Sequence, residues 1–370
     1  MAAHPYLILA AISLALGLMA GLVMHRADYC LAGMFRDLFL FRQSFMLRTL
    51  VLLVTAAMFF LNAARLAGLP LPSAALFGPP GLSNLLGGFA FGVGMVLAGG
   101  CVVGTLYKMG AGSLVSAAAF VGLVAGSTVY AELAPTWSAF ARATTFSSRL
   151  TLPEWLGLSP IWVSSALLLM SFALLLHWGR SGKMTRSAPA EGYLQPWRAA
   201  LLLALLVVVS DLTIGMPFGI TTAYTKVGGY LEALVAPRHF ATLGFYHHAS
   251  FRYLPPLAAV PLQGGAAPRL DVLAAIQFPL VAGIFLGAAI SAIRLREFHV
   301  YVKLPPRQFV SAFAGGAIMG LAARLAPSCN VWHLLGGLPL LASSSVLFLG
   351  GLLPGSWLGS RLLVRWVLLG

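Results

Sequence analysis

The sequence of 370 residues contains few charged side chains and very few acidic ones. Only 9% of its residues are Asp, Glu, Lys or Arg, nine of them acidic, whereas 59% are hydrophobic. A soluble domain carries about 25% charged residues, so the composition excludes a soluble globular protein. Together with a mean hydropathy of +0.91, it predicts an all-α integral membrane protein.

Cysteine is scarce as well. The chain has three, Cys30, Cys101 and Cys329, widely spaced and without a C-x-x-C pair, which argues against a disulfide framework and against a zinc site. The sequence also lacks a phosphate-binding Gly-Lys-Ser/Thr loop, a G-x-S-x-G elbow and an H-E-x-x-H helix. We therefore predict no metal, no cofactor and no enzymatic activity, and a gradient or a downstream reaction must supply any energy.

Apolar runs of about 20 residues, enough to cross a bilayer as a helix, make up most of the sequence. Nine of them are expected, near residues 6–24, 49–67, 83–99, 113–132, 155–177, 199–217, 271–293, 308–325 and 340–360. Basic residues cluster at 36–48, 180–198 and 294–307, between the runs. The net charge of +14 therefore follows the positive-inside pattern and does not indicate a nucleic-acid partner. This pattern places the N-terminus outside and the C-terminus in the cytoplasm.

Two of the cysteines lie in copies of one segment, 228 residues apart. Residues 87–106 and 315–334 align without a gap, and 8 of the 20 positions are identical, including Cys101 and Cys329. The predicted orientation gives the two copies opposite directions across the membrane, as in many secondary transporters, whose sites lie at the repeat interface. We expect a single membrane domain with one repeat half at about 1–180 and the other at about 195–370.

Each repeated cysteine lies at a predicted break in its helix. Gly99, Gly100 and Gly104 surround Cys101, and Pro327 precedes Cys329. Glycine costs about 1 kcal/mol and proline about 3 kcal/mol in a helix interior, and irregular backbone at membrane depth survives only where protein or a watery cavity covers it. We therefore predict short re-entrant helices whose N-termini lie near the thiols and attract anions.

Buried thiols and ionisable groups each have a structural and a functional interpretation. A cysteine in a membrane helix is usually a small apolar side chain, but here all three lie at predicted breaks and two are repeated. Thiols suit a polarizable sulfur-bearing anion. Asp211, inside an apolar run, either relays a coupling ion or pairs with an arginine. Arg324, five residues before Cys329, either attracts an anion or extends to the membrane surface.

The cysteine segments resemble the YeeE/YedE family of bacterial inner-membrane sulfur transporters. The matching pieces are Tyr29–Asp37, Gly99–Tyr107, the repeat from Gly315 to Asn330, and Gly219–Tyr224. The resemblance covers essentially the whole chain. It implies an hourglass of nine spanning helices with short re-entrant helices, and import of thiosulfate through a constriction lined by the three cysteines.

The resemblance also implies a set of substrate-binding residues and a partner. Cys101 and Cys329 would contact substrate and Cys30 would guard one end of the path, with Gly100, Gly104, Asn330 and Arg324 around them. A small cytoplasmic carrier resembling TusA would receive the sulfur. Pro327, Ser328 and Trp332 depart from the glycines usual in the second motif, which leaves another reduced sulfur anion or a selenium analogue open as substrate. Two other classes of function stay open: a sulfurtransferase that forms a cysteine persulfide, and a membrane scaffold for such a pathway.

Overall fold

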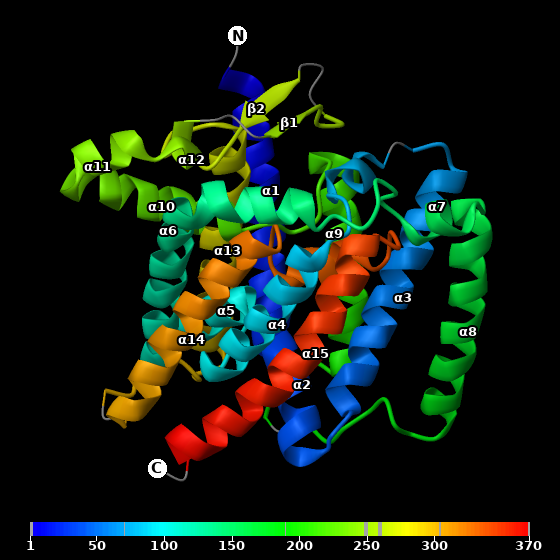
Figure 1. Cartoon of the computed structure of the whole chain (residues 1–370). Coiled ribbons are helices and arrows are strands. Elements are labelled where there is room, and N and C mark those ends of the chain that lie inside the picture. Colours follow the sequence, from blue (N-terminus) through cyan, green and yellow to red (C-terminus); the bar gives the residue numbers. More distant parts are fainter. Residues whose placement is uncertain are drawn as a thin grey trace.

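The computed structural model describes residues 3–69, 71–188, 190–247, 251–257, 261–302 and 305–368, most of which are helical (Figure 1). The long helices are α1 (Ala3–Ala27), α3 (Phe45–Leu66), α4 (Leu82–Leu97), α6 (Leu114–Ala143), α8 (Pro160–Arg180), α9 (Pro196–Ile214), α10 (Thr221–Val235), α13 (Val272–Arg294), α14 (Pro306–Leu325) and α15 (Ser343–Leu363). The shorter ones are α2 (Leu31–Phe41), η1 (Pro72–Leu76), α5 (Val102–Gly110), α7 (Leu152–Leu156), α11 (Pro237–Thr242), α12 (Gly244–His247), η2 (Trp332–Gly337) and η3 (Val364–Leu368). Strands β1 (Phe251–Tyr253) and β2 (Leu262–Gly264) form an antiparallel hairpin that pairs Phe251 with Gly264.

Nine helical stretches within the described residues are long and apolar enough to cross a membrane. This confirms the predicted all-α membrane architecture and the number of spans. The first stretch is longer than the predicted run 6–24, because α1 continues to Ala27 and α2 follows after a short break. Helix α6 is longer than the predicted run 113–132, because it continues to Ala143 beyond the apolar part of its sequence.

Helix α8 lies at the edge of the bundle, on the right in Figure 1, and contacts only α3 and α7 to a notable extent among the described elements. Its side chains Leu169 and Met170 are 73% and 65% exposed. An apolar surface of this kind is stable in contact with lipid tails and not with water. Helix α8 is therefore a peripheral span that takes no part in the centre of the molecule.

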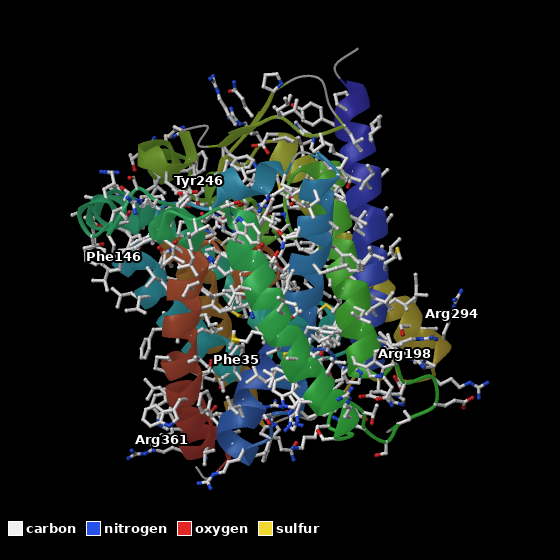
Figure 2. All side chains as sticks on the ribbon, turned by 90° about the vertical axis from the view of Figure 1, so that its right-hand side faces the viewer. Phe35, Phe146, Arg198, Tyr246, Arg294 and Arg361 are labelled. Carbon is white, nitrogen blue, oxygen red and sulfur yellow. The ribbon has the colours of Figure 1, made fainter. Side chains whose placement is uncertain are left out.

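The other eight spans pair in a two-fold pattern. Helix α1 packs on α13, and the matching pair is α9 on α3. Helix α4 packs on α15, and the matching pair is α14 on α6. Helices α4 and α14 also pack on each other. The two chain ends lie at opposite ends of the molecule in Figure 1. Figure 2 places Arg198, Arg294 and Arg361 toward one end of the molecule, with Phe146 and Tyr246 toward the other. Each pairing is thus made between a helix of the first half of the chain and a helix of the second half.

The repeated glycines allow α4 and α14 to approach closely. A Cβ at Gly87 would overlap Ala326, lying 2.6 Å from its backbone N, and a Cβ at Gly315 would overlap Ala98, lying 2.8 Å from the carbonyl carbon of the preceding Leu97. The two contacts are equivalent by the repeat. Gly315 matches Gly87 and Ala326 matches Ala98, each 228 residues later, so each copy contributes the glycine to one contact and the alanine to the other. Close helix crossings at small residues are typical of membrane interfaces, so this repeat is also a packing device.

Both repeated spans end before their cysteine. Helix α4 ends at Leu97, the backbone turns at Gly99 with φ +71°, and α5 starts after Cys101. Helix α14 ends at Leu325, and the backbone turns at Ser328 with φ +100° before Cys329. The predicted breaks at the cysteines are confirmed, and Figure 1 shows α5 in the middle of the bundle.

Candidate functional site

Cys30 and Cys101 come together at Gly104. Cys101 is the N-cap residue of α5, and its Sγ accepts a hydrogen bond from the backbone N–H of Gly104 at 3.3 Å. Cys30 is the N-cap residue of α2. A Cβ on Gly104 would lie 3.0 Å from the Cys30 Sγ and 3.3 Å from the Cys101 Sγ. The two sulfur atoms thus lie on the same side of Gly104, in a space that only glycine leaves free.

Cys329 occupies the matching position in the second copy. It is fully buried, and a helix begins immediately after it at Asn330 and continues into η2. Val331 and Trp332 follow it in the first turn of this helix. Cys329 lies near enough to Cys101 and Arg324 for the charges of these groups to influence one another. The three cysteines, all free thiols and buried, are called the cysteine site below.

Each member of the cysteine site stands at the start of a helix. The first N–H groups of a helix lack partners within it, and its macrodipole is positive at that end. A small anion between these helices would therefore meet backbone N–H groups together with three polarizable sulfur atoms. Such an environment favours a soft anion over a hard cation.

Other predicted residues have varied positions. Gly100 is buried against the first turn of α5, where an added Cβ would lie 3.2 Å from the backbone N of Thr105. Asn330 points its amide Nδ2 at Met95 Sδ, 3.9 Å away, and its Oδ1 has no partner among the described residues. Asp211 makes its side-chain contact elsewhere, accepting a hydrogen bond from Ser73 Oγ at 2.7 Å.

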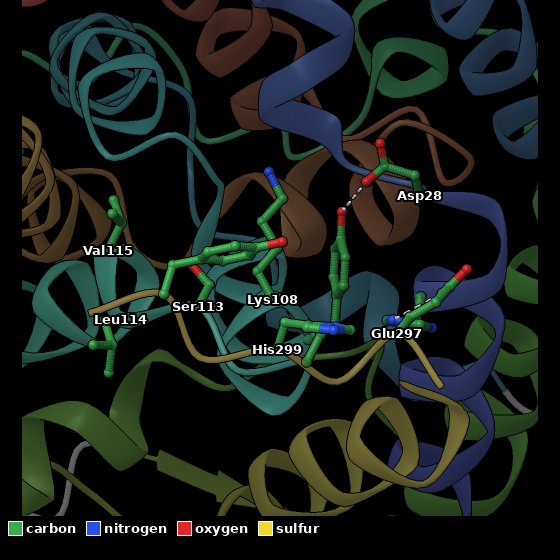
Figure 3. A pocket seen from close by; sticks show the side chains of 11 residues that line it. Asp28, Lys108, Ser113, Leu114, Val115, Glu297 and His299 are labelled. Atoms are coloured by element: carbon green, nitrogen blue, oxygen red, sulfur yellow. Dashed lines mark hydrogen bonds and ion pairs between the residues drawn. The ribbon is translucent and has the colours of Figure 1, made fainter. Parts of the chain in front are cut away.

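A cavity of about 500 Å³ has a lining that includes Asp28, Lys108, Glu297 and His299 (Figure 3). It is called the Lys108 cavity. In it the Tyr107 hydroxyl donates to Asp28 Oδ1 at 2.9 Å, and Lys108 Nζ donates to the Gly99 carbonyl at 2.8 Å. Tyr107 and Lys108 lie close enough to Cys30 to interact with it electrostatically.

A second cavity, of about 420 Å³, lies next to Cys329. It is called the Arg324 cavity. The Arg324 guanidinium donates to the hydroxyls of Thr221 and Thr222. Ser328 and Trp332 also line this cavity. One cavity is thus lined by residues next in sequence to the Cys30 and Cys101 motifs, and the other by Ser328, which precedes Cys329.

The indole of Trp332 helps to enclose the Arg324 cavity. Its ring centroid is 5.3 Å from that of Phe77, and a Cβ on Gly219 would lie 3.1 Å from the indole. The first copy has Gly104 at the matching position, 228 residues earlier. The two copies therefore differ in the volume of the side chain at this position. Gly104 leaves space for two thiols in the first copy, and the large indole of Trp332 fills the matching space in the second.

Sequence reasoning missed three residues around the cysteine site. Asp28 and Tyr107 carry no predicted role, yet the two are hydrogen-bonded near Cys30. Tyr224 is buried close to Cys101 and Cys329, and its hydroxyl has no hydrogen-bond partner among the described residues. For Asp28 and Tyr107 the available signal is their closeness in sequence to Cys30 and Cys101, because Tyr107 lies on α5, the helix that Cys101 caps.

Nine apolar stretches among the described residues define a multi-pass membrane protein, with three buried thiols at helix starts in its interior. The chain matches the model of the family described as "Sulphur transport" over residues 26–358, and it belongs to that family. This confirms the predicted YeeE/YedE relationship.

Several curated relatives agree with this assignment. Thiosulfate transporter TsuA of Spirochaeta thermophila is 28% identical over 358 residues, 95% of this chain and 98% of the relative. Thiosulfate transporter TsuA of Escherichia coli is 38% identical over 96 residues, 26% of this chain and 27% of the relative. The probable transporter YedE of Salmonella typhimurium is 30% identical over 161 residues, 43% of this chain and 38% of the relative.

Proposed function

We propose that this protein is a permease that imports a small sulfur-containing anion, thiosulfate above all, through a constriction formed by the cysteine site. The observation that carries the proposal is the convergence of Cys30 and Cys101 at Gly104, with Cys329 buried at the matching position of the second copy. Thiosulfate has a polarizable terminal sulfur atom. A site of thiols and backbone N–H groups binds such a sulfur atom better than it binds a strongly hydrated oxygen atom. The name of the relative that matches along its full length supports the same substrate.

The charge of the Arg324 cavity suits an anion, because Arg324 is the one charged side chain among its described lining residues. On the other side, Lys108 lines its cavity together with Asp28 and Glu297. Asn330 and the small Gly100 border the thiols. The substrate would pass between the cations while hydrogen bonds from thiols, amides and the free Tyr224 hydroxyl replace its hydration shell.

Orientation and coupling complete the proposal. With the basic clusters in the cytoplasm, the Lys108 cavity opens to the cytoplasm and the Arg324 cavity to the outside of the plasma membrane. The N-terminus is then outside and the C-terminus inside. A TusA-like carrier would accept the sulfur at the Lys108 cavity. Asp211, buried with a free Oδ1 and no arginine partner among the described residues, would serve the coupling of transport to an ion gradient.

The test is uptake of radiolabelled thiosulfate into proteoliposomes that contain only the purified chain. Cys101→Ser is the informative variant, because serine preserves the N-cap of α5 and removes the soft sulfur. We expect uptake to fall about tenfold or more, since a change of about 1.4 kcal/mol in binding is a factor of ten. Equal uptake by the variant and the parent would refute the thiol path.

Two further measurements separate the alternative functions. Intact-mass spectrometry after exposure to thiosulfate detects a persulfide as one added sulfur atom, and an unmodified chain supports permeation without covalent chemistry. Uptake by the pure chain excludes a role as a scaffold only. Competition with unlabelled selenium analogues then ranks the substrates.

A further inference from the structure

Arg324 lacks an acidic partner among the described residues. Its guanidinium donates to two neutral acceptors, the hydroxyls of Thr221 and Thr222, and its Nε–H is buried without a partner. A guanidinium has five N–H donors and no acceptor, and one withdrawn from water is normally paired with a carboxylate. No Asp or Glu belongs to the described residues that line the Arg324 cavity. The cavity therefore holds an uncompensated positive charge.

The same cavity contains further hydrogen-bond donors. Thr221 and Thr222 are the first residues of α10, and no side chain caps that helix at Ile220. The next N–H group, that of Ala223, donates to Gln277 Oε1 at 2.9 Å, and Gln277 also lines the cavity. Each threonine hydroxyl accepts from Arg324 and keeps its own O–H as a donor. Guanidinium, hydroxyls and free helix N–H groups together form a donor set for oxygen-bearing anions.

We infer that the Arg324 cavity is a separate binding site for the oxyanion group of the substrate, built by Arg324, Thr221 and Thr222. This inference rests on the proposed function. The oxygen atoms bind at these hard donors, and the terminal sulfur of the same ion faces Cys329 and the other thiols. Selectivity then takes place in two steps, oxyanion charge first and soft sulfur second.

The two-step arrangement gives a distinctive role to sulfate. Sulfate has the tetrahedral oxygens that the first site binds but no terminal sulfur for the thiols. It should therefore occupy the Arg324 cavity, slow the uptake of thiosulfate and not cross the membrane. A protein with only the cysteine site would show none of these effects of sulfate.

The experiment uses the purified full chain and inorganic sulfate as the probe. In proteoliposomes we expect sulfate to inhibit labelled thiosulfate uptake competitively, and labelled sulfate to stay outside. In detergent, sulfate should raise the thermal unfolding midpoint of the parent, because a ligand that binds only the folded state stabilises it. Arg324→Gln should weaken both effects about tenfold or more, the loss expected for charge-assisted hydrogen bonds. The double variant T221V/T222V should do the same if Arg324→Gln does not fold.

Two controls separate this inference from the proposed function. Arg294→Gln removes an exposed arginine at the end of α13 and should leave the effect of sulfate unchanged. Cys101→Ser should lose transport and keep the stabilisation by sulfate. Unchanged inhibition by sulfate in Arg324→Gln overturns the oxyanion site, and transport of sulfate by the parent overturns the second step, selection by the thiols. Normal transport by Cys101→Ser with loss of the effect of sulfate in Arg324→Gln overturns the thiol path and leaves the oxyanion site standing.

Discussion

The sulfur atoms of Cys30 and Cys101 occupy the space beside Gly104 where any other residue would place its Cβ, at 3.0 Å and 3.3 Å from that position. Cys30 comes from the break between α1 and α2, and Cys101 from the break between α4 and α5. The helix that carries Gly104 therefore sets the distance between two thiols that are far apart in sequence.

Gly104→Ala should impair transport without unfolding the protein. The added methyl group must displace one or both sulfur atoms, and overpacking of this kind costs about 1–3 kcal/mol, equivalent to about 5- to 150-fold in affinity. Uptake at low thiosulfate concentration measures the effect. Gly33→Ala is the matched control, because its Cβ would meet only the Cys30 Cβ at an ordinary 3.6 Å. Equal uptake by both variants would contradict the proposed role of Gly104.

Ser328→Gly should stabilise the protein. Ser328 has φ +100°, a conformation that glycine adopts without strain and that costs other residues about 1–3 kcal/mol. The unfolding midpoint in detergent should rise accordingly. Ser328→Ala removes the hydroxyl and keeps the strain, so it should show no such gain, and a similar gain from alanine would assign the effect to the hydroxyl.

Asp211→Asn should remove the dependence of uptake on an imposed ion gradient. The carboxylate is buried, with one hydrogen bond from Ser73 and a free Oδ1, and asparagine cannot titrate or bind a cation by charge. Uptake with and without the gradient is the measurement. Ser73→Ala removes the same hydrogen bond but keeps the carboxylate. If both variants respond to the gradient like the parent, Asp211 has only a structural role.

Lys226→Met should destabilise the loop beside the Arg324 cavity. Lys226 Nζ is buried and donates to Asp271 Oδ2 at 2.8 Å and to the Ala267 carbonyl at 2.6 Å. Removing one partner of a buried pair costs about 3–5 kcal/mol, because the other charge is left uncompensated. The double variant K226M/D271N should recover part of this loss. Thermal unfolding compares the three proteins, and additive losses would argue against the pairing.

The sequence was sufficient to predict the architecture, because apolar length and basic clusters are local properties. Nine spans, breaks at the cysteines and the family relationship were all predicted and are confirmed. The reciprocal contacts of Gly87 with Ala326 and of Gly315 with Ala98 explain why the repeated glycines could be recognised. They mark the closest approach of the two copies.

The side-chain contacts around the path could not be predicted in the same way. The Tyr107–Asp28 hydrogen bond joins residues 79 positions apart, and the two threonines that receive Arg324 belong to α10, about a hundred residues before it. Such contacts depend on how non-local helices pack and not on local composition. Asp211 is an example. The sequence predicted either an arginine or a coupling ion as its partner, but the observed hydrogen bond comes from Ser73, 138 residues earlier in the chain.

The pairing of α1 with α13 and of α4 with α15 has a consequence for biosynthesis. The helices emerge from the ribosome in order, so the first copy enters the membrane before its packing partners have been translated. During that interval its small-residue faces and its two thiols remain without their final neighbours. These contacts form only after the last helix has been made, so the surroundings of the cysteine site are complete only when synthesis ends.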